Sequence, residues 1–371
     1  MVAPLDWGLG HATRCIPLIK QLLNNGCTVT IAASGSIKVL LANEFPGISI
    51  IQLQGYNIQY TATKRWLPLK ILAQAPKIML SIKREHTWLQ NVVRENKFDA
   101  VISDNRFGLY TNKIPCIFIT HQLLIQAPFA WLEKLIQRAN YQYINRFTGC
   151  WVPDFETGLT VAGKLSHPER LPAVPVSYIG PLSRFEKAVP GALKYSWMII
   201  LSGPEPQRSI LEKKILAVAT RLEGNILLVR GKPGSIENVT PPANCTIINH
   251  LDTRQMQQAI AESEYIVSRC GYTTVMEMLA LGKKTVLIPT PGQTEQEYLA
   301  EHLREQGWCY SCPQDSNLEG HLTTARTWFN YKIPVLPKNS LEKVVKEFVK
   351  KGSGSDCGFP IADWGRMSKR T

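Results

Sequence analysis

Residues 265–290 read YIVSRCGYTTVMEMLALGKKTVLIPT, and the fold prediction begins from the order of elements in this segment. A β-branched, apolar run ends at Ser268, a turn follows at Gly271, and a helix is predicted to continue through Leu281 and stop near Gly282. A second apolar run occupies residues 284–289. Strand, helix and strand in this order form a βαβ unit, in which the two strands are parallel and the crossover is right-handed.

The same alternation extends along most of the chain. Strands are predicted at residues 28–33, 48–53, 98–103, 115–119 and 149–153, and again at residues 197–202, 225–230, 245–249, 264–268 and 284–289. A chain of 371 residues also exceeds what one hydrophobic core usually supports. The sequence therefore predicts an α/β protein with two parallel sheets.

The boundary between the two predicted domains lies in a segment with little periodicity. Residues 172–195 include four prolines, which favours an interdomain connection. We expect a first domain over residues 1–185, a second over residues 186–351 that ends in an amphipathic helix at 341–351, and a tail over 352–371. Only five residues precede the first predicted turn, so the first strand is short, and an upstream start of the natural chain stays open.

Composition and charge narrow the classes of function. Hydrophobic residues make up 44% of the chain and charged residues 19%, as in an ordinary globular protein, and the net charge of +13 predicts anionic partners. No nucleic-acid-binding motif accompanies this charge, so nucleic acid is not an expected partner. No apolar run approaches the roughly 18 residues that span a bilayer, and no signal peptide precedes the first strand, so we expect a cytoplasmic protein.

The nine cysteines are scattered, which favours reduced thiols over a disulfide framework. Cys309 and Cys312 alone have the spacing of metal ligands, and no second pair lies near them in the sequence. Because a structural zinc ion needs about four ligands, no metal site is expected.

A glycine-rich turn, residues 6–14 (DWGLGHATR), opens the first predicted helix. Gly8 and Gly10 expose backbone amides at a helix N-terminus, where anions or polar ligand groups are favoured. A dinucleotide fold would use this turn for pyrophosphate, but it also needs an acidic ribose ligand after the second strand. The strand ending at residue 33 is followed by Ser-Gly-Ser instead, which argues against an NAD enzyme.

Three residues in the first half are candidates for proton transfer. His11 heads the helix, where it either hydrogen-bonds the loop or acts as a general base, because an imidazole near its reference pKa of about 6.5 accepts a proton at neutral pH. Asp104 follows the strand at 98–103 and is either a rival base, a group that orients His11 or a cap of the next segment. His121 follows the next strand and has a similar position.

Two consecutive strands of the second half end in polar residues. Residues 268–277 (SRCGYTTVME) lead into one helix, and residues 290–298 (TPGQTEQEY) form a turn that leads into the next. Glu277, one and a half turns inside the first helix, either accepts hydrogen bonds from ribose hydroxyls or is a solvated surface carboxylate.

This pair of motifs resembles the donor half of GT-B glycosyltransferases, especially the family-28 enzymes that include the transferase adding GlcNAc to the peptidoglycan lipid intermediate. The family pattern Ser-Arg-x-Gly-x-x-Thr-x-x-Glu is matched from Ser268 to Glu277, and Gln296 matches the first glutamine of a Gln-Gln pair. Glu297 departs from the second glutamine. The Gly8–His11 turn, residues 8–11, is similar to the family's N-terminal motif. The resemblance implies two Rossmann-like domains that face each other across a cleft.

The resemblance also implies roles for residues in both domains. Glu277 would bind the ribose, Gln296 and Glu297 the sugar hydroxyls, and Leu251 the base, while the loop at 202–208 or Arg184 would bind the diphosphate. His11 and Asp104 are the catalytic candidates. The complete donor-binding set is Gly8, Gly10, Arg184, Ser202, Gly203, Arg208, His250, Leu251, Ser268, Gly271, Tyr272, Thr273, Thr274, Glu277, Gln296 and Glu297.

The resulting hypothesis is an inverting, metal-independent transfer of GlcNAc or another hexose from a UDP-sugar to an acceptor hydroxyl. The UDP-sugar is a co-substrate, and no cofactor is expected. The acceptor would be a glycan or a lipid-linked sugar. Basic and apolar residues mix at 64–71 and at Lys83 and Arg84, which is typical of peripheral membrane contact or of an amphipathic helix on the sheet. The alternatives are a UDP-sugar epimerase on the same fold and a non-catalytic nucleotide-sugar binding protein.

Overall fold

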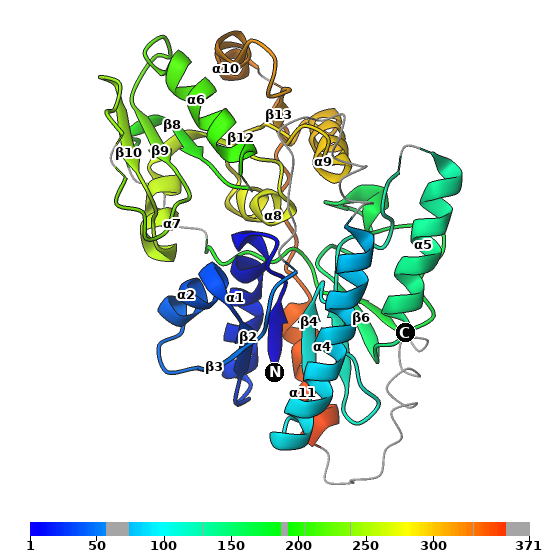
Figure 1. The fold of residues 1–371 in the computed structure, drawn as a ribbon. Helices are drawn as coiled ribbons and strands as arrows, with labels where there is room; N and C mark the ends of the chain where they lie inside the picture. The colour runs from blue at the N-terminus through cyan, green and yellow to red at the C-terminus, as the bar shows by residue number, and fades with distance from the viewer. Residues whose placement is uncertain are drawn as a thin grey trace. The chain divides into compact units, whose positions relative to one another are not determined.

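The computed structural model describes residues 1–56, 74–127, 129–186, 192–203, 205–237, 239–328 and 330–353. They divide into two compact units (Figure 1). Unit 1 holds the described residues up to 182 and again from 337, and unit 2 holds those from 183 to 336. The segment 64–71, with its mixed basic and apolar residues, lies outside the described residues.

Unit 1 is built on a seven-stranded parallel sheet in the order β3-β2-β1-β4-β5-β6-β7. Helices flank the sheet, as parallel strands require for their crossovers (Figure 1). The strands are β1 Val2–Pro4, β2 Thr30–Ala33, β3 Ser49–Gln52, β4 Val101–Asp104, β5 Cys116–Ile119, β6 Gly149–Val152 and β7 Val176–Tyr178, and the helices are α1 Leu9–Asn24, α2 Gly35–Glu44, α4 Ala75–Glu95, α5 Ala130–Ile144 and α11 Leu341–Ser353, with a short 3₁₀ turn at Gly163–Leu165.

Unit 2 is built on a six-stranded parallel sheet in the order β10-β9-β8-β11-β12-β13. Its helix α8 ends where the sequence predicts, because Gly282 takes the left-handed conformation at φ 65° that glycine adopts without steric cost. The strands are β8 Tyr195–Ile200, β9 Ile226–Val229, β10 Cys245–Ile248, β11 Ser263–Ser268, β12 Lys284–Leu287 and β13 Tyr310–Ser311, and the helices are α6 Gln207–Ala219, α7 Thr253–Ala261, α8 Tyr272–Leu281, α9 Thr294–Glu305 and α10 Leu318–Thr327.

The apolar runs of the sequence form the central strands because both faces of each sheet are covered. All four residues of β4, β5, β6 and β9 are buried. Separate apolar clusters form in the two units, one around Phe118 and Val152 and another around Trp197 and Ile288. The predicted α/β fold with two parallel sheets is therefore confirmed.

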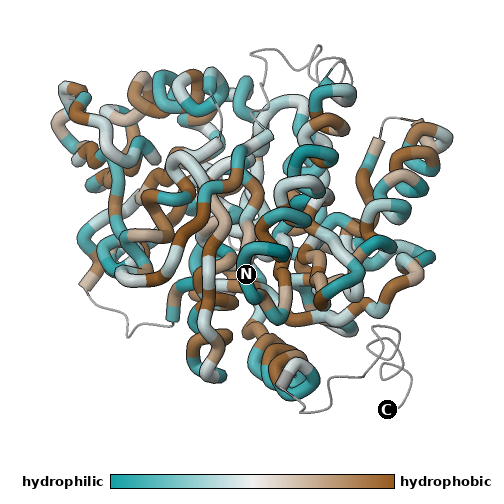
Figure 2. The backbone as a smooth tube through the Cα atoms, turned by 60° about the horizontal axis from the view of Figure 1, so that its bottom comes forward, coloured by the Kyte–Doolittle hydropathy of each residue, from teal (hydrophilic) through white to brown (hydrophobic). Residues whose placement is uncertain are grey.

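The C-terminal helix corrects the predicted domain limits. The sequence placed residues 186–351 in one domain, but residues from 337 onward belong to unit 1. Helix α11 packs on α1, and Phe348 contacts Trp151 of β6 edge-on with ring centroids 5.3 Å apart. The helix is amphipathic, with apolar and polar residues alternating around its coil (Figure 2). The apolar face of such a helix can cover either sheet, so the sequence of the helix does not say which sheet it joins.

The proposed connection at residues 172–195 also needs correction, because its first part contains β7. Three half-buried residues, Val176–Tyr178, pair with β6 and form the edge of the unit 1 sheet. Prolines on either side made this strand too short to recognise from its pattern. Residues 187–191, at the expected boundary, lie outside the described residues.

Each sheet reverses its strand order once, between β1 and β4 in unit 1 and between β8 and β11 in unit 2. Ligands of open α/β sheets bind at the carboxyl ends of the strands beside such a reversal. The Gly8 turn follows β1 and Asp104 ends β4, whereas Ser202 follows β8 and Ser268 ends β11. The main sequence candidates therefore occupy the favoured edge of each sheet.

Candidate active site

Helix α1 begins directly after the glycine turn. Gly8 is its N-cap, with φ 110° and ψ 169°, a conformation that is essentially restricted to glycine. A side chain at this position would meet no neighbouring atom, so the backbone conformation, and not lack of space, requires the glycine. Gly10 and His11 lie in the first turn of the helix, and the N-cap supplies no side-chain cap.

His11 and Asp104 lie in hydrogen-bonding contact. Nδ1 of His11 is 3.0 Å from Oδ2 of Asp104 and 2.8 Å from Nη2 of Arg14. Nε of Arg14 donates to both carboxylate oxygens of Asp104, at 3.0 and 2.9 Å, and Nη2 donates to Oδ1 as well. The His11 side chain keeps 15% of its surface exposed, whereas that of Asp104 keeps 1%. Both of these contacts are made by Nδ1, and Nε2 of His11 makes no hydrogen bond to any described residue.

The three side chains set one another's protonation. Burial tends to raise the pKa of Asp104, but Arg14 and then His11 outweigh it and lower that pKa to about 2. Burial lowers the pKa of His11, Arg14 lowers it further, and Asp104 opposes both. His11 is therefore neutral at neutral pH, while Asp104 is ionised and held by Arg14.

His121 joins this group only loosely. It is buried at 4% exposure, and its Nδ1 is 3.5 Å from Nη1 of Arg14. The structure thus brings all three proton-transfer candidates of the sequence around Arg14. Of the three, His11 alone is not buried.

Helix α8 positions the first donor motif of unit 2. Ser268 ends β11, Gly271 is the N-cap of α8, and Tyr272, Thr273 and Thr274 form the first turn. Gly271 has an ordinary φ of −79°, so the turn does not require glycine for its conformation. A Cβ there would meet no atom within 4 Å, which leaves open space in front of the helix N-terminus.

Glu277 and Arg184, both predicted donor ligands, form an ion pair in unit 2. Nε of Arg184 is 2.9 Å from Oε1 of Glu277, and their side chains are 12% and 7% exposed. Neither atom makes a hydrogen bond of good geometry within the described part of the chain. Burial raises the pKa of Glu277, and Arg184 opposes this shift. Glu277 is therefore buried, and the alternative interpretation of a solvated surface carboxylate is wrong.

The residues near this pair include His250 and Leu251. Burial and then the Arg184 charge lower the pKa of His250. Leu251 belongs to an apolar cluster with Phe185 and Met278, and the Arg184 guanidinium lies 4.6 Å from the centre of the Phe185 ring.

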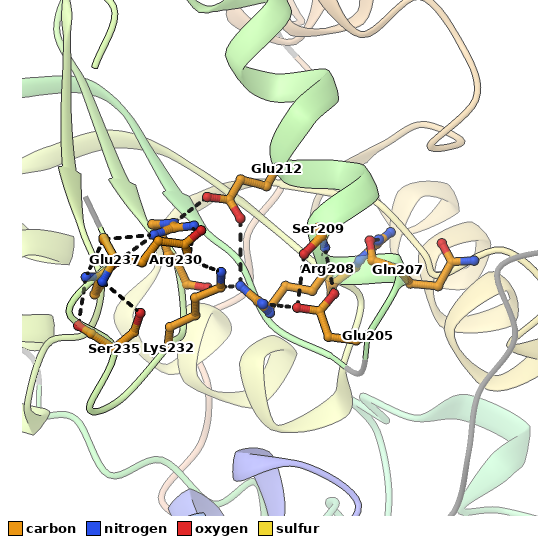
Figure 3. Close-up of polar contacts among 11 residues, drawn as sticks. Glu205, Gln207, Arg208, Ser209, Glu212, Arg230, Lys232, Ser235 and Glu237 are labelled. Carbon is orange, nitrogen blue, oxygen red and sulfur yellow. Dashed lines mark hydrogen bonds and ion pairs between the residues drawn. The ribbon is translucent and has the colours of Figure 1, made fainter. Parts of the chain in front are cut away.

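The loop between β8 and α6 contains an internal carboxylate at the start of the helix (Figure 3). Glu205 accepts hydrogen bonds from the backbone N and the Oγ of Ser209, at 3.2 and 3.0 Å, and pairs with Arg208. Arg208 also donates to the carbonyl oxygen of Arg230 at 3.0 Å. Ser202 is half-buried and Gly203 takes φ 93°. Arg208 is thus bound to protein groups in the free protein, which sequence reasoning did not foresee.

The second donor motif folds back on its own turn. Oε1 of Gln296 accepts from the backbone N of Thr290 at 2.8 Å, and Oε1 of Glu297 accepts from that of Gly292 at 3.0 Å. Both side chains belong to the first turn of α9. The amide NH₂ of Gln296 donates to no described residue.

A protein-family model matches the part of the chain that contains both donor motifs. Residues 210–350 match the model of the glycosyltransferase family 28 C-terminal domain. An uncharacterized glycosyltransferase of Methanosarcina acetivorans is 26% identical over 344 residues, which is 84% of this chain and 86% of that protein. The protein is a glycosyltransferase that is similar to family 28 over residues 210–350.

More distant relatives of this glycosyltransferase carry specific names. The UDP-N-acetylglucosamine--N-acetylmuramyl-(pentapeptide) pyrophosphoryl-undecaprenol N-acetylglucosamine transferase of Haemophilus ducreyi is 23% identical over 300 residues, 71% of this chain and 79% of that protein. Among solved structures, spinosyn rhamnosyltransferase SpnG matches with a TM-score of 0.62 at 13% identity, over 97% of each chain. Acinetobacter baumannii MurG matches at 0.54 and 18% identity, over 95% of this chain and 98% of its own. These structural matches establish the GT-B fold.

A buried network in unit 1 of the transferase was missed by sequence reasoning. Arg106, 1% exposed, donates to Oε1 of Glu85 at 2.5 Å and to the carbonyl oxygen of Pro4 at 2.8 Å. The Tyr56 hydroxyl donates to Oε2 of Glu85 at 2.6 Å, and the Tyr56 backbone N donates to Asp6 at 3.1 Å. The network joins α4 to the segments that follow β1, β3 and β4, and so fixes the surroundings of the Gly8 turn.

Two other missed residues are arginines that belong to the motifs themselves. Arg14 follows His11 by three positions, a spacing that places both on one face of a helix, and this signal was available in the sequence. Arg269 follows Ser268 and was noted only as a family match. Within the described ranges, no group of three or more His, Cys, Asp or Glu side chains is arranged to hold a metal ion. None of the helices described here combines the length and apolar character needed to cross a membrane.

Proposed function

We propose that this glycosyltransferase moves GlcNAc or another hexose from a UDP-sugar to an acceptor hydroxyl, by an inverting displacement that needs no metal ion. The observation that carries the donor assignment is the buried Glu277 carboxylate, whose Oε1 faces Arg184 without a well-formed hydrogen bond. A buried acceptor atom in this condition is costly unless a ligand completes it. Ribose hydroxyls are donors of the required kind.

The name of the Haemophilus ducreyi relative supports uridine and GlcNAc, because that protein is named for a UDP-N-acetylglucosamine donor. The diphosphate would lie at the N-terminus of α8, where Gly271 leaves space and the helix dipole favours an anion. The N-terminus of α6 is the alternative in unit 2. Glu205 lies there in the free protein and would have to give way to a second anion.

His11 is the proposed general base. Its Nε2 takes the proton of the acceptor hydroxyl, and the oxygen attacks the anomeric carbon of the sugar. The bond from that carbon to the diphosphate breaks with its electron pair going to UDP, and the new bond forms on the opposite face, which inverts the centre. Helix N-termini and arginine charge, in place of a metal ion, stabilise the departing diphosphate.

Asp104 is the weaker candidate for the base because it is fully buried and both of its oxygens accept from Arg14. Its pKa of about 2 also makes it a poor proton acceptor at neutral pH. We propose that Asp104 and Arg14 orient His11. Neutral His11 with its proton on Nδ1, donated to Oδ2 of Asp104, leaves Nε2 able to accept a proton.

A lipid-linked acceptor, bound while the enzyme contacts a membrane peripherally, is proposed from the surface of two helices. Met79 and Leu80 on α4, and Trp131 and Leu135 on α5, are 48–67% exposed. Phe129, the N-cap of α5, is 60% exposed and stacks with Trp131. Exposed basic residues lie on the same helices at Lys83, Arg84, Lys134 and Arg138. Apolar and cationic side chains together suit an anionic lipid surface.

The test of the donor assignment is a calorimetric and thermal-shift panel of UDP, GDP, dTDP, ADP and NAD on wild type and Glu277→Ala. Selective UDP binding, weakened by the substitution by roughly tenfold or more through loss of charged hydrogen bonds, is expected. Binding of NAD alone, or of no nucleotide, would overturn the assignment.

The test of the base is His11→Ala, assayed with UDP-GlcNAc and candidate acceptors. We expect UDP affinity within twofold of wild type and turnover lower by about 10² to 10⁴. Unchanged turnover would refute the role of His11. Conversion of UDP-GlcNAc without an acceptor would instead identify an epimerase.

A further inference from the structure

Arg269 is a buried cation at the centre of unit 2. It is 1% exposed and lies between Ser268, the last residue of β11, and Gly271, the N-cap of α8. Its Nη2 donates to the carbonyl oxygen of Gln207 at 2.7 Å and to Oε1 of Gln314. Its Nη1 lies 3.4 and 3.3 Å from the carbonyl oxygens of residues 288 and 289. The guanidinium therefore joins the first residue of α6 to the segments after β12 and β13.

All of these partners are neutral oxygens, which sets Arg269 apart. Among the described residues five arginines are buried, and four of them pair with a carboxylate: Arg14 with Asp104, Arg106 with Glu85, Arg208 with Glu205, and Arg230 with Glu212. No carboxylate of the described residues pairs with Arg269, and its Nε has no hydrogen-bond partner there.

A buried charge without a counter-charge is destabilising, and proteins usually neutralise or pair it. Burial lowers the pKa of Arg269 to about 10, which still leaves it fully charged at neutral pH. The hydrogen bonds satisfy part of the guanidinium but supply no negative charge. The charge of Asp315 acts on Arg269 from a distance, but Asp315 is 72% exposed and pairs with Lys214, so the fold retains a buried positive charge that is only weakly balanced.

We propose that Arg269 is a positioning residue whose charge is balanced by the diphosphate of the donor. Its position supports this assignment, because it connects the start of α6 with the start of α8, the two helix N-termini beside the β8–β11 reversal. Both helix dipoles and the buried cation favour an anion at the same edge of the sheet. Because Arg269 is shielded from solvent, salt screens its charge little.

The inference rests on the proposed UDP-sugar donor and predicts a particular energetic signature. A residue with a merely structural role would affect uridine and UDP equally when it is replaced. A buried charge that complements the diphosphate affects UDP alone. The informative quantity is therefore the ratio of uridine to UDP dissociation constants, measured by calorimetry on the full chain.

The variants are Arg269→Met, Arg269→Lys and the control Arg221→Met, whose arginine is 53% exposed and pairs with Glu319. We expect Arg269→Met to lose roughly tenfold or more of its preference for UDP over uridine, with uridine affinity retained, because one nearby charge is removed from a poorly screened site. Arg269→Lys keeps the charge and should keep most of the preference. Arg221→Met should match wild type.

Four outcomes decide between the proposals. A wild type that binds neither UDP nor uridine refutes the donor assignment itself. A wild type that prefers UDP, together with an Arg269→Met variant that prefers it equally, refutes only the role of Arg269. Equal losses in Arg269→Met and Arg269→Lys would show that the hydrogen bonds alone matter. If Arg269→Met does not fold, Arg269→Lys decides the question. A tenfold or greater reduction in its preference for UDP over uridine would likewise overturn the charge argument.

Discussion

Replacement of Asp104 by asparagine tests the carboxylate that we propose orients His11. Asp104 is fully buried, and its carboxylate accepts from Arg14 and contacts His11 at 3.0 Å. Asparagine has nearly the same shape but no charge. The substitution therefore leaves Arg14 as a buried cation without its counter-charge, and the strand end and helix start that this pair joins should be destabilised.

The magnitude follows from the pKa of Asp104. Its shift from 3.8 to about 2 is nearly two units, which corresponds to about 2 kcal/mol of stabilisation of the ionised form. Breaking a buried pair on one side costs more, about 3–5 kcal/mol, because the remaining charge is uncompensated. Because the pKa in the folded protein is depressed, the stabilisation is complete above about pH 4 and is lost as the pH falls towards 2.

Hydrogen exchange measured by mass spectrometry reads this effect within unit 1. At pH 7 the amides of β4 and the first turns of α1 should exchange about 30-fold faster or more in Asp104→Asn, since about 2 kcal/mol is a factor of roughly thirty. The strands of unit 2 should be unchanged. Glu95→Gln, which removes an exposed carboxylate at the end of α4, is the matched control. Equal exchange in the two variants, or a difference that does not shrink below pH 4, refutes the reasoning.

Three further predictions follow from the site. In Arg14→Met, His11 faces the Asp104 charge without the opposing cation, so the pKa of His11 rises. The acidic limb of the kcat/KM profile should therefore move to higher pH, and activity should recover under alkaline conditions. An unmoved limb, or an unchanged NMR titration of His11, contradicts this prediction. Turnover should persist in EDTA, and its loss with restoration by a divalent ion would exclude a metal-independent mechanism. Anionic vesicles should bind the protein at low salt and release it near 0.5 M salt. Trp131→Ser should weaken this binding several-fold relative to Trp328→Phe. Equal binding by the two variants would exclude the α5 surface as the membrane contact.

Most of the two sheets could be predicted because long, buried parallel strands have a strong pattern. The ten predicted strands correspond to β2 to β6 and β8 to β12, with limits that differ by a few residues. The two strands that were not predicted are the shortest edge strands, Val176–Tyr178 and Tyr310–Ser311. Val176–Tyr178 is only half-buried, and Tyr310–Ser311 has only two residues, so neither strand carries a run long enough to show the alternating or apolar pattern that identifies the others.

The places of the candidate site residues in the fold could also be predicted, but their partners could not. His11, Asp104 and Ser268 lie near the carboxyl ends of strands beside the point where the strand order of each sheet reverses. Ligands of open α/β sheets bind at this edge. Sequence patterns give no contact between residues 90 positions apart, such as Arg14 and Asp104. For the same reason Arg208 was predicted as a phosphate ligand, although Glu205 and the Arg230 carbonyl hold it in the free protein.

The five buried arginines show why burial and pairing must be considered together. In the sequence, Arg14, Arg208 and Arg269 look alike, since each belongs to a segment in which a strand leads through a turn into a helix. In the structure, Arg14 and Arg208 have carboxylate partners, so their charge is already balanced and a phosphate would have to compete for it. Arg269 has no such partner within the described residues, so an arriving anion gains its attraction without displacing another group. The arginine that was least conspicuous as a phosphate ligand is therefore the one whose charge most favours a diphosphate at this edge of the sheet.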